Sequence, residues 1–177
     1  AFRQDQTKTR YASQQELLKY CEKSANPVGR MILGIGGCLD DTNATLSDHI
    51  CTGLQLANFW QDVARDFQID RVYLPADAMA THGVTESMLS EDSTPPQLRK
   101  CLSEQCDVGE RHLRTGLALC ERVPNWLSKD VRLFAHGGLS TIQAIRNIDH
   151  DVLRQRPRVA RRQQLTLMAK ACLGILN

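Results

Sequence analysis

The sequence predicts an all-α fold, a helical bundle formed as a single domain by residues 1–177. Apolar residues recur every three or four positions through most of the chain, which is the period of an amphipathic helix. Pro, Gly and helix-capping residues separate these segments, and none of them shows the sustained alternation of a half-buried strand. A chain of 177 residues is long enough for one well-buried core and too short for two ordinary domains.

The first helical segment follows a capping signal. Ser13, with Glu16 three residues later, forms a capping box, so we expect a helix to begin there. Pro27 predicts a kink or a break, because proline lacks a backbone donor and disfavours a helical residue before it. The polar segment CLDDTNATLSDH predicts a connection in which Asp40 and Asp41 act as turn or capping residues.

Four longer helices are expected after this connection, at about 46–67, 95–122, 124–147 and 164–176. A loop around Pro75 has room for a further short helix. Gly137 and Gly138 predict either a kink in their helix or the close approach of another segment. The final segment, LTLMAKACLGIL, would permit docking on a membrane surface, but we favour a last helix of the bundle.

Composition favours a cytoplasmic protein. The seven cysteines are odd in number and form no CxxC pair, which is typical of reduced thiols in a core. No stretch approaches the roughly 20 apolar residues of a membrane-spanning helix, and the first residues lack the apolar core of a signal peptide. The five histidines show no metal-ligand spacing, and we expect them on the surface.

Positive charge is concentrated near the C-terminus. Nucleic acid, an anionic lipid surface and a diphosphate are all partners that such a cluster could bind, but for most of these arginines we favour a solvated helix start. The cluster consists of Arg154, Arg156, Arg158, Arg161 and Arg162.

A polar stripe crosses the otherwise apolar segment LQLANFWQDVARDF. At 100° per residue, its members fall within an arc of roughly 80° on one helix. They are Gln55, Asn58, Asp62 and Asp66. Two carboxylates one turn apart, with two amides on the same face, form an oxygen-rich wall of the kind that Mg²⁺ prefers. Spacing alone leaves a metal or diphosphate site and a buried polar network equally open.

Three stretches together resemble the squalene and phytoene synthase family, in the family's order and at its approximate spacing. They are YCEKSANPVGRMIL, LQLANFWQDVARDFQIDRVYLP and DVLRQRPRV. The middle stretch is similar to the family's second aspartate-rich motif, whose aspartates fall on Asp62 and Asp66. The resemblance implies an isoprenoid synthase fold. Because nothing here matches the family's other aspartate-rich helix, it also implies an N-terminally truncated, C-terminal portion that is inactive alone and self-associates.

The resemblance also implies a Mg²⁺-dependent prenyl diphosphate enzyme. Asp62, Asp66 and Asn58 would hold the metal and act in catalysis. The other substrate-binding positions that it implies are Gln55, Arg71, Tyr73 and Arg156 near the diphosphate, and Tyr20, Ala25, Val28, Gly29 and Leu33 along an apolar tunnel. The tunnel positions are also compatible with an ordinary core. Arg71 could instead cap a helix, Tyr73 anchor a loop, and Arg158 take the place of Arg156.

Within the family, the sequence resembles the branch that converts presqualene diphosphate to hydroxysqualene on the route to squalene and hopanoids. Gln61 stands where related enzymes usually carry Arg, and glutamine lacks the bidentate fork of a guanidinium. In this branch water ends the reaction, so no nicotinamide is expected. The expected partner is a prenyl diphosphate and not nucleic acid, and the expected location is the cytoplasm, with peripheral contact at the inner face of the membrane.

Two alternatives remain open. The first is a squalene or presqualene diphosphate synthase that condenses two farnesyl diphosphates head to head, with hydride from NADPH in the squalene-forming case. The second is of another class, a non-catalytic relative that serves as a helical partner or a membrane-surface binding module through its arginine cluster.

Overall fold

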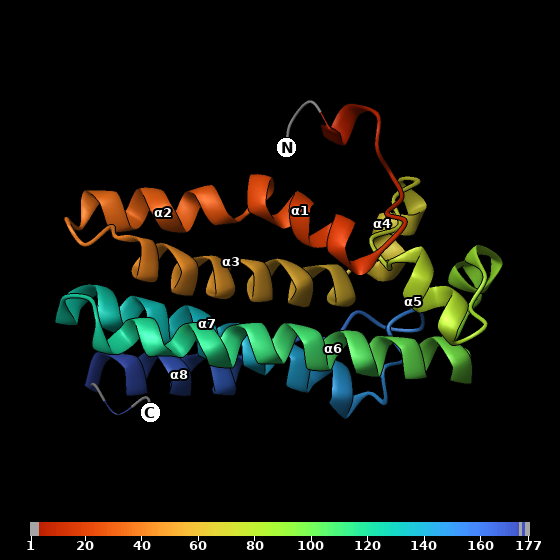
Figure 1. Cartoon of the computed structure of the whole chain (residues 1–177). Helices are drawn as coiled ribbons and strands as arrows, with labels where there is room; N and C mark the ends of the chain where they lie inside the picture. The colour runs from red at the N-terminus through yellow and green to blue at the C-terminus, as the bar shows by residue number, and fades with distance from the viewer. Residues whose placement is uncertain (1–3, 174, 176–177) are drawn as a thin grey trace.

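A computed structural model describes residues 4–173 and 175, in which long antiparallel helices are stacked in layers (Figure 1). The described part of the chain contains no β-strand, only an isolated bridge between Arg10 and Val72, so the prediction of an all-α bundle is confirmed. The α-helices are α1 (Gln14–Ser24), α2 (Asn26–Ile35), α3 (Asp41–Gln61), α4 (Val63–Gln68), α5 (Ala76–Thr81), α6 (Pro96–Gly116), α7 (Asn125–Asn147) and α8 (Arg161–Leu173). Short 3-10 helices span Gln4–Gln6, Glu86–Ser90 and Leu117–Glu121.

The first two helices obey their local signals. The Ser13 hydroxyl accepts a hydrogen bond from the Glu16 amide at 3.2 Å, and the Glu16 carboxylate accepts one from the Ala12 amide at 2.7 Å. The capping box is therefore confirmed, although its return bond goes to Ala12 instead of Ser13. The predicted break at Pro27 is also confirmed, because α1 ends at Ser24 and Pro27 lies in the first turn of α2.

The third helix differs from its prediction at both ends. It begins at Asp41 and not near residue 46, because the Asp40 carboxylate caps it by accepting the Asn43 amide at 2.7 Å. The segment predicted to be a polar connection is helical because its buried polar group is satisfied: the Asn43 side chain donates to the Cys38 carbonyl at 2.8 Å. The helix is then interrupted at Asp62, whose φ of −108° and ψ of 15° separate α3 from α4.

The later helices agree more closely with the sequence. The helix predicted at 95–122 is α6 followed by the 3-10 turn Leu117–Glu121. The α7 helix runs unbroken across both glycines, and the predicted close approach of another segment is found at one of them. A Cβ atom at Gly138 would lie 2.9 Å from the Leu113 side chain, whereas one at Gly137 would meet nothing within 4 Å.

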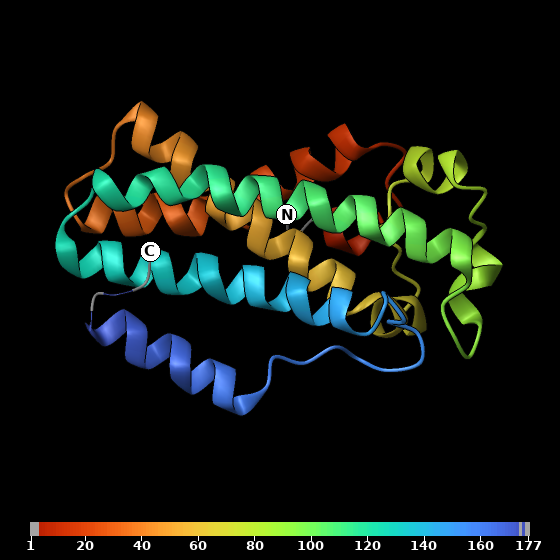
Figure 2. The ribbon, with the colours of Figure 1, turned by 90° about the horizontal axis from the view of Figure 1, so that it is seen from below.

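The core forms where α3 packs against α6 and α7 (Figures 1 and 2). Trp60 of α3 is fully buried, and its indole N–H donates to the Gln105 carbonyl of α6 at 3.1 Å. Glycine permits this close pairing. A Cβ at Gly53 would lie 2.6 Å from Leu113, and one at Gly116 would lie 2.6 Å from Ile50.

All five histidines are partly buried, so their predicted position on the surface is wrong. His49 of α3 and His112 of α6 lie with their Nδ1 atoms 3.0 Å apart. Burial, and then the neighbouring His49, lower the pKa of His112 to about 4. The surface expectation failed because contacts with segments distant in the sequence decide burial, as between His49 and His112, and such contacts are not visible in local spacing.

Six cysteines lie in the part of the chain whose side chains are described, and all six are free thiols, as predicted. Burial raises the pKa of Cys21, Cys101 and Cys106 to about 12, so these thiols stay protonated. Among the described helices, none combines the length and the hydropathy that crossing a membrane requires.

Substitution by alanine should have opposite effects on stability at a glycine in close contact with another helix and at a glycine with open space around it. Gly53→Ala should lower the free energy of unfolding by about 1 to 3 kcal/mol, because its Cβ would also lie 3.0 Å from the Gly109 carbonyl oxygen. Gly137→Ala should raise it by up to about 1 kcal/mol, since alanine is the better helix former and the space is open. Urea unfolding of both variants checks this. A Gly53→Ala protein as stable as its parent would contradict the close packing of α3 on α6.

Candidate functional site

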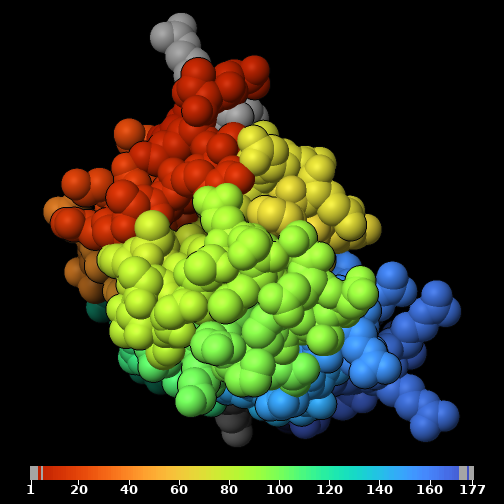
Figure 3. Space-filling view, turned by 90° about the vertical axis from the view of Figure 1, so that its right-hand side faces the viewer, coloured from red at the N-terminus to blue at the C-terminus, as the bar shows by residue number. Residues whose placement is uncertain are grey.

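The aspartates of the polar stripe lie at one end of the bundle, where α3 gives way to α4. The connection between α7 and α8 passes the same end, and we call its residues 154–160 the strap (Figure 2). In the space-filling view of this end, the surface formed by α4 borders the surface of the segment that follows α7 (Figure 3). Residues far apart in the sequence therefore meet at the break after α3.

Asp62 is bound by an arginine of the strap. Its Oδ1 accepts from Nε of Arg156 at 2.6 Å, and its Oδ2 accepts from Nη2 at 3.0 Å. Arg65 adds a weaker ion pair, with Nη1 at 3.5 Å from Oδ1. The hydrogen bond from Arg156 is the main reason that the pKa of Asp62 lies below its ordinary value. Of the two arginines considered for this position, Arg156 is the one that reaches the Asp62 carboxylate.

Asp66 lies one turn further, in α4, and its environment opposes ionisation. Burial, followed by the negative charge of Asp62, raises the pKa of Asp66 from 3.8 to about 6. Arg71 and Arg65 act in the other direction without cancelling this effect. The charge of Asp66 is therefore disfavoured by its surroundings, whereas that of Asp62 is stabilised by Arg156.

The two amides of the stripe lie on α3 as predicted. The side chain of Asn58 is exposed and that of Gln55 is partly exposed. The Asn58 carbonyl accepts the Asp62 amide at 3.0 Å, so the helical bonding continues up to the break. Asn58 and Asp62 are thus held one turn apart at the end of α3.

The loop after α4 brings Arg71 and Tyr73 back to this end. The Arg71 amide donates to the Asp66 carbonyl at 2.8 Å, and its guanidinium donates to the Tyr73 hydroxyl at 3.3 Å. The Tyr73 ring stacks on Phe59 with centroids 3.8 Å apart. Tyr20 joins this aromatic cluster, with its ring centroid 6.1 Å from that of Tyr73.

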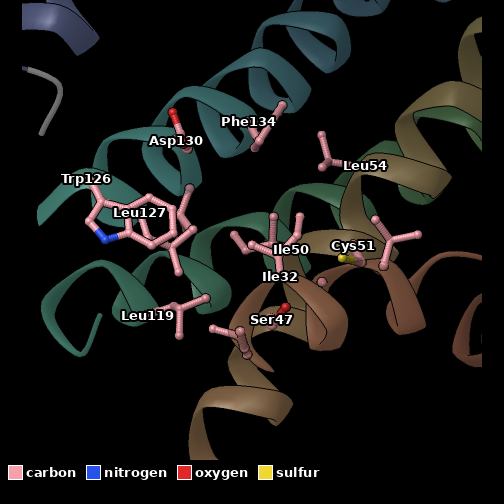
Figure 4. Close-up of a pocket in the computed structure, with 14 residues that line it drawn as sticks. Ile32, Ser47, Ile50, Cys51, Leu54, Leu119, Trp126, Leu127, Asp130 and Phe134 are labelled. Atoms are coloured by element: carbon pink, nitrogen blue, oxygen red, sulfur yellow. The ribbon is translucent and has the colours of Figure 1, made fainter. Parts of the chain in front are cut away.

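An apolar pocket of about 260 Å³ lies further back along α3, between α2, α3 and α7 (Figure 4). Three of the predicted tunnel residues, Val28, Gly29 and Leu33, are among its lining residues. Tyr20 and Ala25 are not, because Tyr20 packs in the aromatic cluster and Ala25 lies at the junction of α1 and α2. The pocket also uses residues that the sequence did not single out: Ile32, Ser47, Ile50, Cys51, Leu54, Leu119, Trp126, Leu127, Asp130, Val131 and Phe134.

Gly29 has a specific packing role in this pocket. A Cβ atom there would lie 2.2 Å from the Ser47 hydroxyl oxygen and 2.7 Å from the Cys51 sulfur. Glycine therefore lets α2 approach α3, in addition to any relief of crowding near Pro27. No local signal in the sequence could identify this contact, because it depends on which helix packs beside α2.

The carboxylate pair fits one side of a Mg²⁺ site. Its donors are oxygens, its charge is negative, and the guanidinium at Asp62 shows that a cation is accommodated there. Among the described residues, no group of three or more His, Cys, Asp or Glu side chains could hold a metal. The remaining ligands of a bound Mg²⁺ would therefore come from water, from substrate phosphates or from amides such as Asn58.

This chain is similar in sequence to proteins of one enzyme family. The family described as squalene/phytoene synthase matches residues 1–163. A hydroxysqualene synthase of Sinorhizobium fredii is 39% identical over 136 residues, which cover 75% of this chain and 44% of that protein. A presqualene diphosphate synthase of Rhodopseudomonas palustris is 33% identical over 129 residues, covering 71% and 45%. This chain thus spans less than half the length of these curated relatives.

A solved structure agrees with these matches. The squalene synthase HpnC of Alicyclobacillus acidocaldarius superposes with a TM-score of 0.82 at 37% identity, over 84% of this chain and 57% of that one. The helices described above therefore have the arrangement found in a structure of related sequence.

Removal of the second carboxylate should stabilise the protein at neutral pH. The pKa of Asp66 is raised on folding, so its charged form costs stability above pH 6, and that cost disappears as the pH falls below about 4. We expect Asp66→Asn to raise the free energy of unfolding by about 1 kcal/mol at pH 7.5, allowing for partial exposure, and by almost nothing at pH 4.

Urea unfolding at the two pH values measures this, with the exposed Asp92→Asn as a control that should change stability at neither. A loss of stability for Asp66→Asn at pH 7.5 would contradict the account of a carboxylate whose charge is unfavourable. Removing a charge is expected to stabilise the protein when that charge belongs to a binding site, and to destabilise it when the charge belongs to a structural ion pair.

Proposed function

This chain belongs to the squalene/phytoene synthase family, and from that premise we propose that the whole protein converts presqualene diphosphate to hydroxysqualene in isoprenoid biosynthesis. One observation carries the proposal. A single helix, α3, lines the apolar pocket through Cys51 and Leu54 and ends at Gln61, immediately before Asp62 and its partner Arg156. A substrate with a charged diphosphate and a long hydrocarbon needs a charged site and an apolar pocket that lie one after the other along its length.

The charged end would hold the diphosphate. Asp62 and Asp66, with Asn58 and Gln55 on the same face, would hold Mg²⁺, which when bound neutralises the charge on a departing diphosphate. Arg156 offers a planar fork of donors that suits phosphate oxygens. We propose that Arg71, which donates to Tyr73, forms the other edge of this site with it.

The apolar end would hold the hydrocarbon. Carbocations react with any water that reaches them, so a lining of Ile32, Leu54 and Phe134 would protect the rearranging cation. We propose that water ends the reaction and that no nicotinamide takes part. The proposal is supported by the likeness to a hydroxysqualene synthase and by Gln61, which replaces the arginine usual in the relatives that form presqualene diphosphate.

The first rival is head-to-head condensation of two farnesyl diphosphates. The likeness to a presqualene diphosphate synthase favours it, at lower identity than the likeness to a hydroxysqualene synthase. The second rival is a non-catalytic relative. The presence of Asp62, Asp66, Asn58 and Gln55 on one face weighs against a scaffold, since a protein without a ligand has no need of such an oxygen-rich stripe.

Product analysis of the complete open reading frame tests the proposal. With presqualene diphosphate and Mg²⁺, we expect hydroxysqualene without NADPH, identified by mass spectrometry. Asp62→Asn should reduce kcat at least 100-fold, since loss of a metal ligand removes stabilisation of the leaving group. Asp41→Asn, at the opposite end of α3, is the matched control and should leave the rate unchanged.

The other outcomes of this assay discriminate between the rivals. Squalene formed only with NADPH, or turnover of farnesyl diphosphate alone, would replace the proposal with the condensing enzyme. No turnover of either substrate by a folded, complete protein would favour the non-catalytic relative.

We also propose partners for this chain, with support from its exposed apolar side chains. Large apolar side chains are exposed along α2, including Met31 at 60% and Ile35 at 86%, beside the mouth of the pocket. Exposed Leu165 and Met168 on α8 support a peripheral membrane contact on the cytoplasmic side. We propose no nucleic-acid partner.

We expect the 177-residue chain, expressed alone, to self-associate through the exposed face of α2, because soluble monomers rarely leave such patches uncovered. Light scattering at several concentrations measures this. Met31→Lys and Ile35→Lys together should shift the mass toward that of a monomer, while Lys substitutions at the exposed Thr42 and Thr45 should not. A monomer at every concentration would contradict the expectation. We also propose that this chain alone lacks turnover, which diphosphate release in the presence of Mg²⁺ would contradict.

A further inference from the structure

Gln61, the last residue of α3, holds the strap by two different atoms. Its side-chain Nε2 donates to the Pro157 carbonyl at 2.7 Å, and its Oε1 accepts from Nη2 of Arg156 at 3.0 Å. Pro157 is buried, so the strap is anchored there by packing as well. The neutral amide thus contacts both the backbone of the strap and the guanidinium that binds Asp62.

The segment just before the strap is also held in place by polar contacts. The buried Asp151 carboxylate accepts the Thr94 amide at 2.7 Å and pairs with Arg99 at 3.0 Å. Because Asp151 and Pro157 are both fixed, the Arg156 side chain can change partner while the backbone beside it stays in place.

Arg156 occupies the donor atoms that a metal would need. Both carboxylate oxygens of Asp62 accept from its guanidinium. A cation bound by Asp62 must therefore displace at least one of these hydrogen bonds. The displaced guanidinium would stay next to the site, where a diphosphate offers it the same bidentate geometry with more negative charge.

We propose that Gln61 is a positioning residue that anchors the strap while Arg156 exchanges the Asp62 carboxylate for a substrate diphosphate as the cation binds. The inference rests on the proposed function for the identity of the diphosphate. An arginine at position 61 could not play this part, because a second guanidinium would repel Arg156 and offers no acceptor for its Nη2. The exchange thus accounts for glutamine at this position.

The exchange predicts opposite changes in two affinities of one variant. In the complete protein, Arg156→Gln should bind Mg²⁺ alone about three- to tenfold more tightly, because a competing cation has been removed from Asp62. The same variant should bind inorganic diphosphate, at saturating Mg²⁺, at least tenfold more weakly, because a charge-assisted fork is lost. Isothermal titration calorimetry measures both. Arg158→Gln, an exposed arginine of the same strap, is the control and should change each by less than twofold.

Gln61 is tested by a variant of similar shape. Gln61→Met removes both hydrogen bonds, so we expect faster amide hydrogen exchange at residues 154–160 and weaker diphosphate binding, with the Mg²⁺ affinity equal to or above that of the parent. Gln68→Met, an exposed glutamine in α4, should leave all three unchanged. The exchange measurement also reports whether each variant is folded.

Three results would overturn the exchange. Weaker binding of both Mg²⁺ and diphosphate by Arg156→Gln would mean that the arginine only supports the structure. Unchanged affinities would mean that it does not take part in the site. Absence of Mg²⁺ binding by the parent protein would mean that Asp62 does not bind the cation. Failure of the proposed function looks different. Opposite shifts in the two affinities without turnover of presqualene diphosphate would leave the exchange standing and exclude the reaction.

Discussion

The ion pair between Asp62 and Arg156 is the contact on which the charge balance of the candidate site depends. It joins residues 94 positions apart in the sequence and brings a guanidinium of the strap onto the junction of α3 and α4. The helical break at Asp62 turns its carboxylate toward the strap, while Asp66 lies half-buried in the following turn. The charge of Asp62 is thereby stabilised by a neighbouring guanidinium, while that of Asp66 is disfavoured by burial and by Asp62.

The same helix connects this end to the apolar pocket. Close packing by glycine makes the connection rigid: Gly53 lets α6 approach α3 from one side, and Gly29 lets α2 approach it from another. Trp60, bonded to the Gln105 carbonyl, fixes the rotation of α3 just before the break. The direction in which Asp62 faces and the position of the pocket are therefore set by a single packed element.

The features that were predicted correctly from the sequence are set by residues close together in the chain, and the features that were missed are set by contacts between helices. The capping box at Ser13, the break at Pro27 and the extent of α7 follow from residues within a few positions of each other. The early start of α3 does not, because Asn43 is helical and buried only through its bonds to the Cys38 carbonyl and to Arg122. The bond from Gln61 to Pro157 spans 96 positions, so no pattern near Gln61 could show it.

A crystal structure of the complete protein with Mg²⁺ and diphosphate tests the central claim most directly, since it measures which atoms Arg156 contacts when the site is filled. The account predicts Mg²⁺ bound by Asp62 and Asp66, the guanidinium of Arg156 within hydrogen-bond distance of the diphosphate, and the bond between Gln61 and Pro157 retained. A structure in which Arg156 still binds both oxygens of Asp62, with the metal held elsewhere, would contradict it.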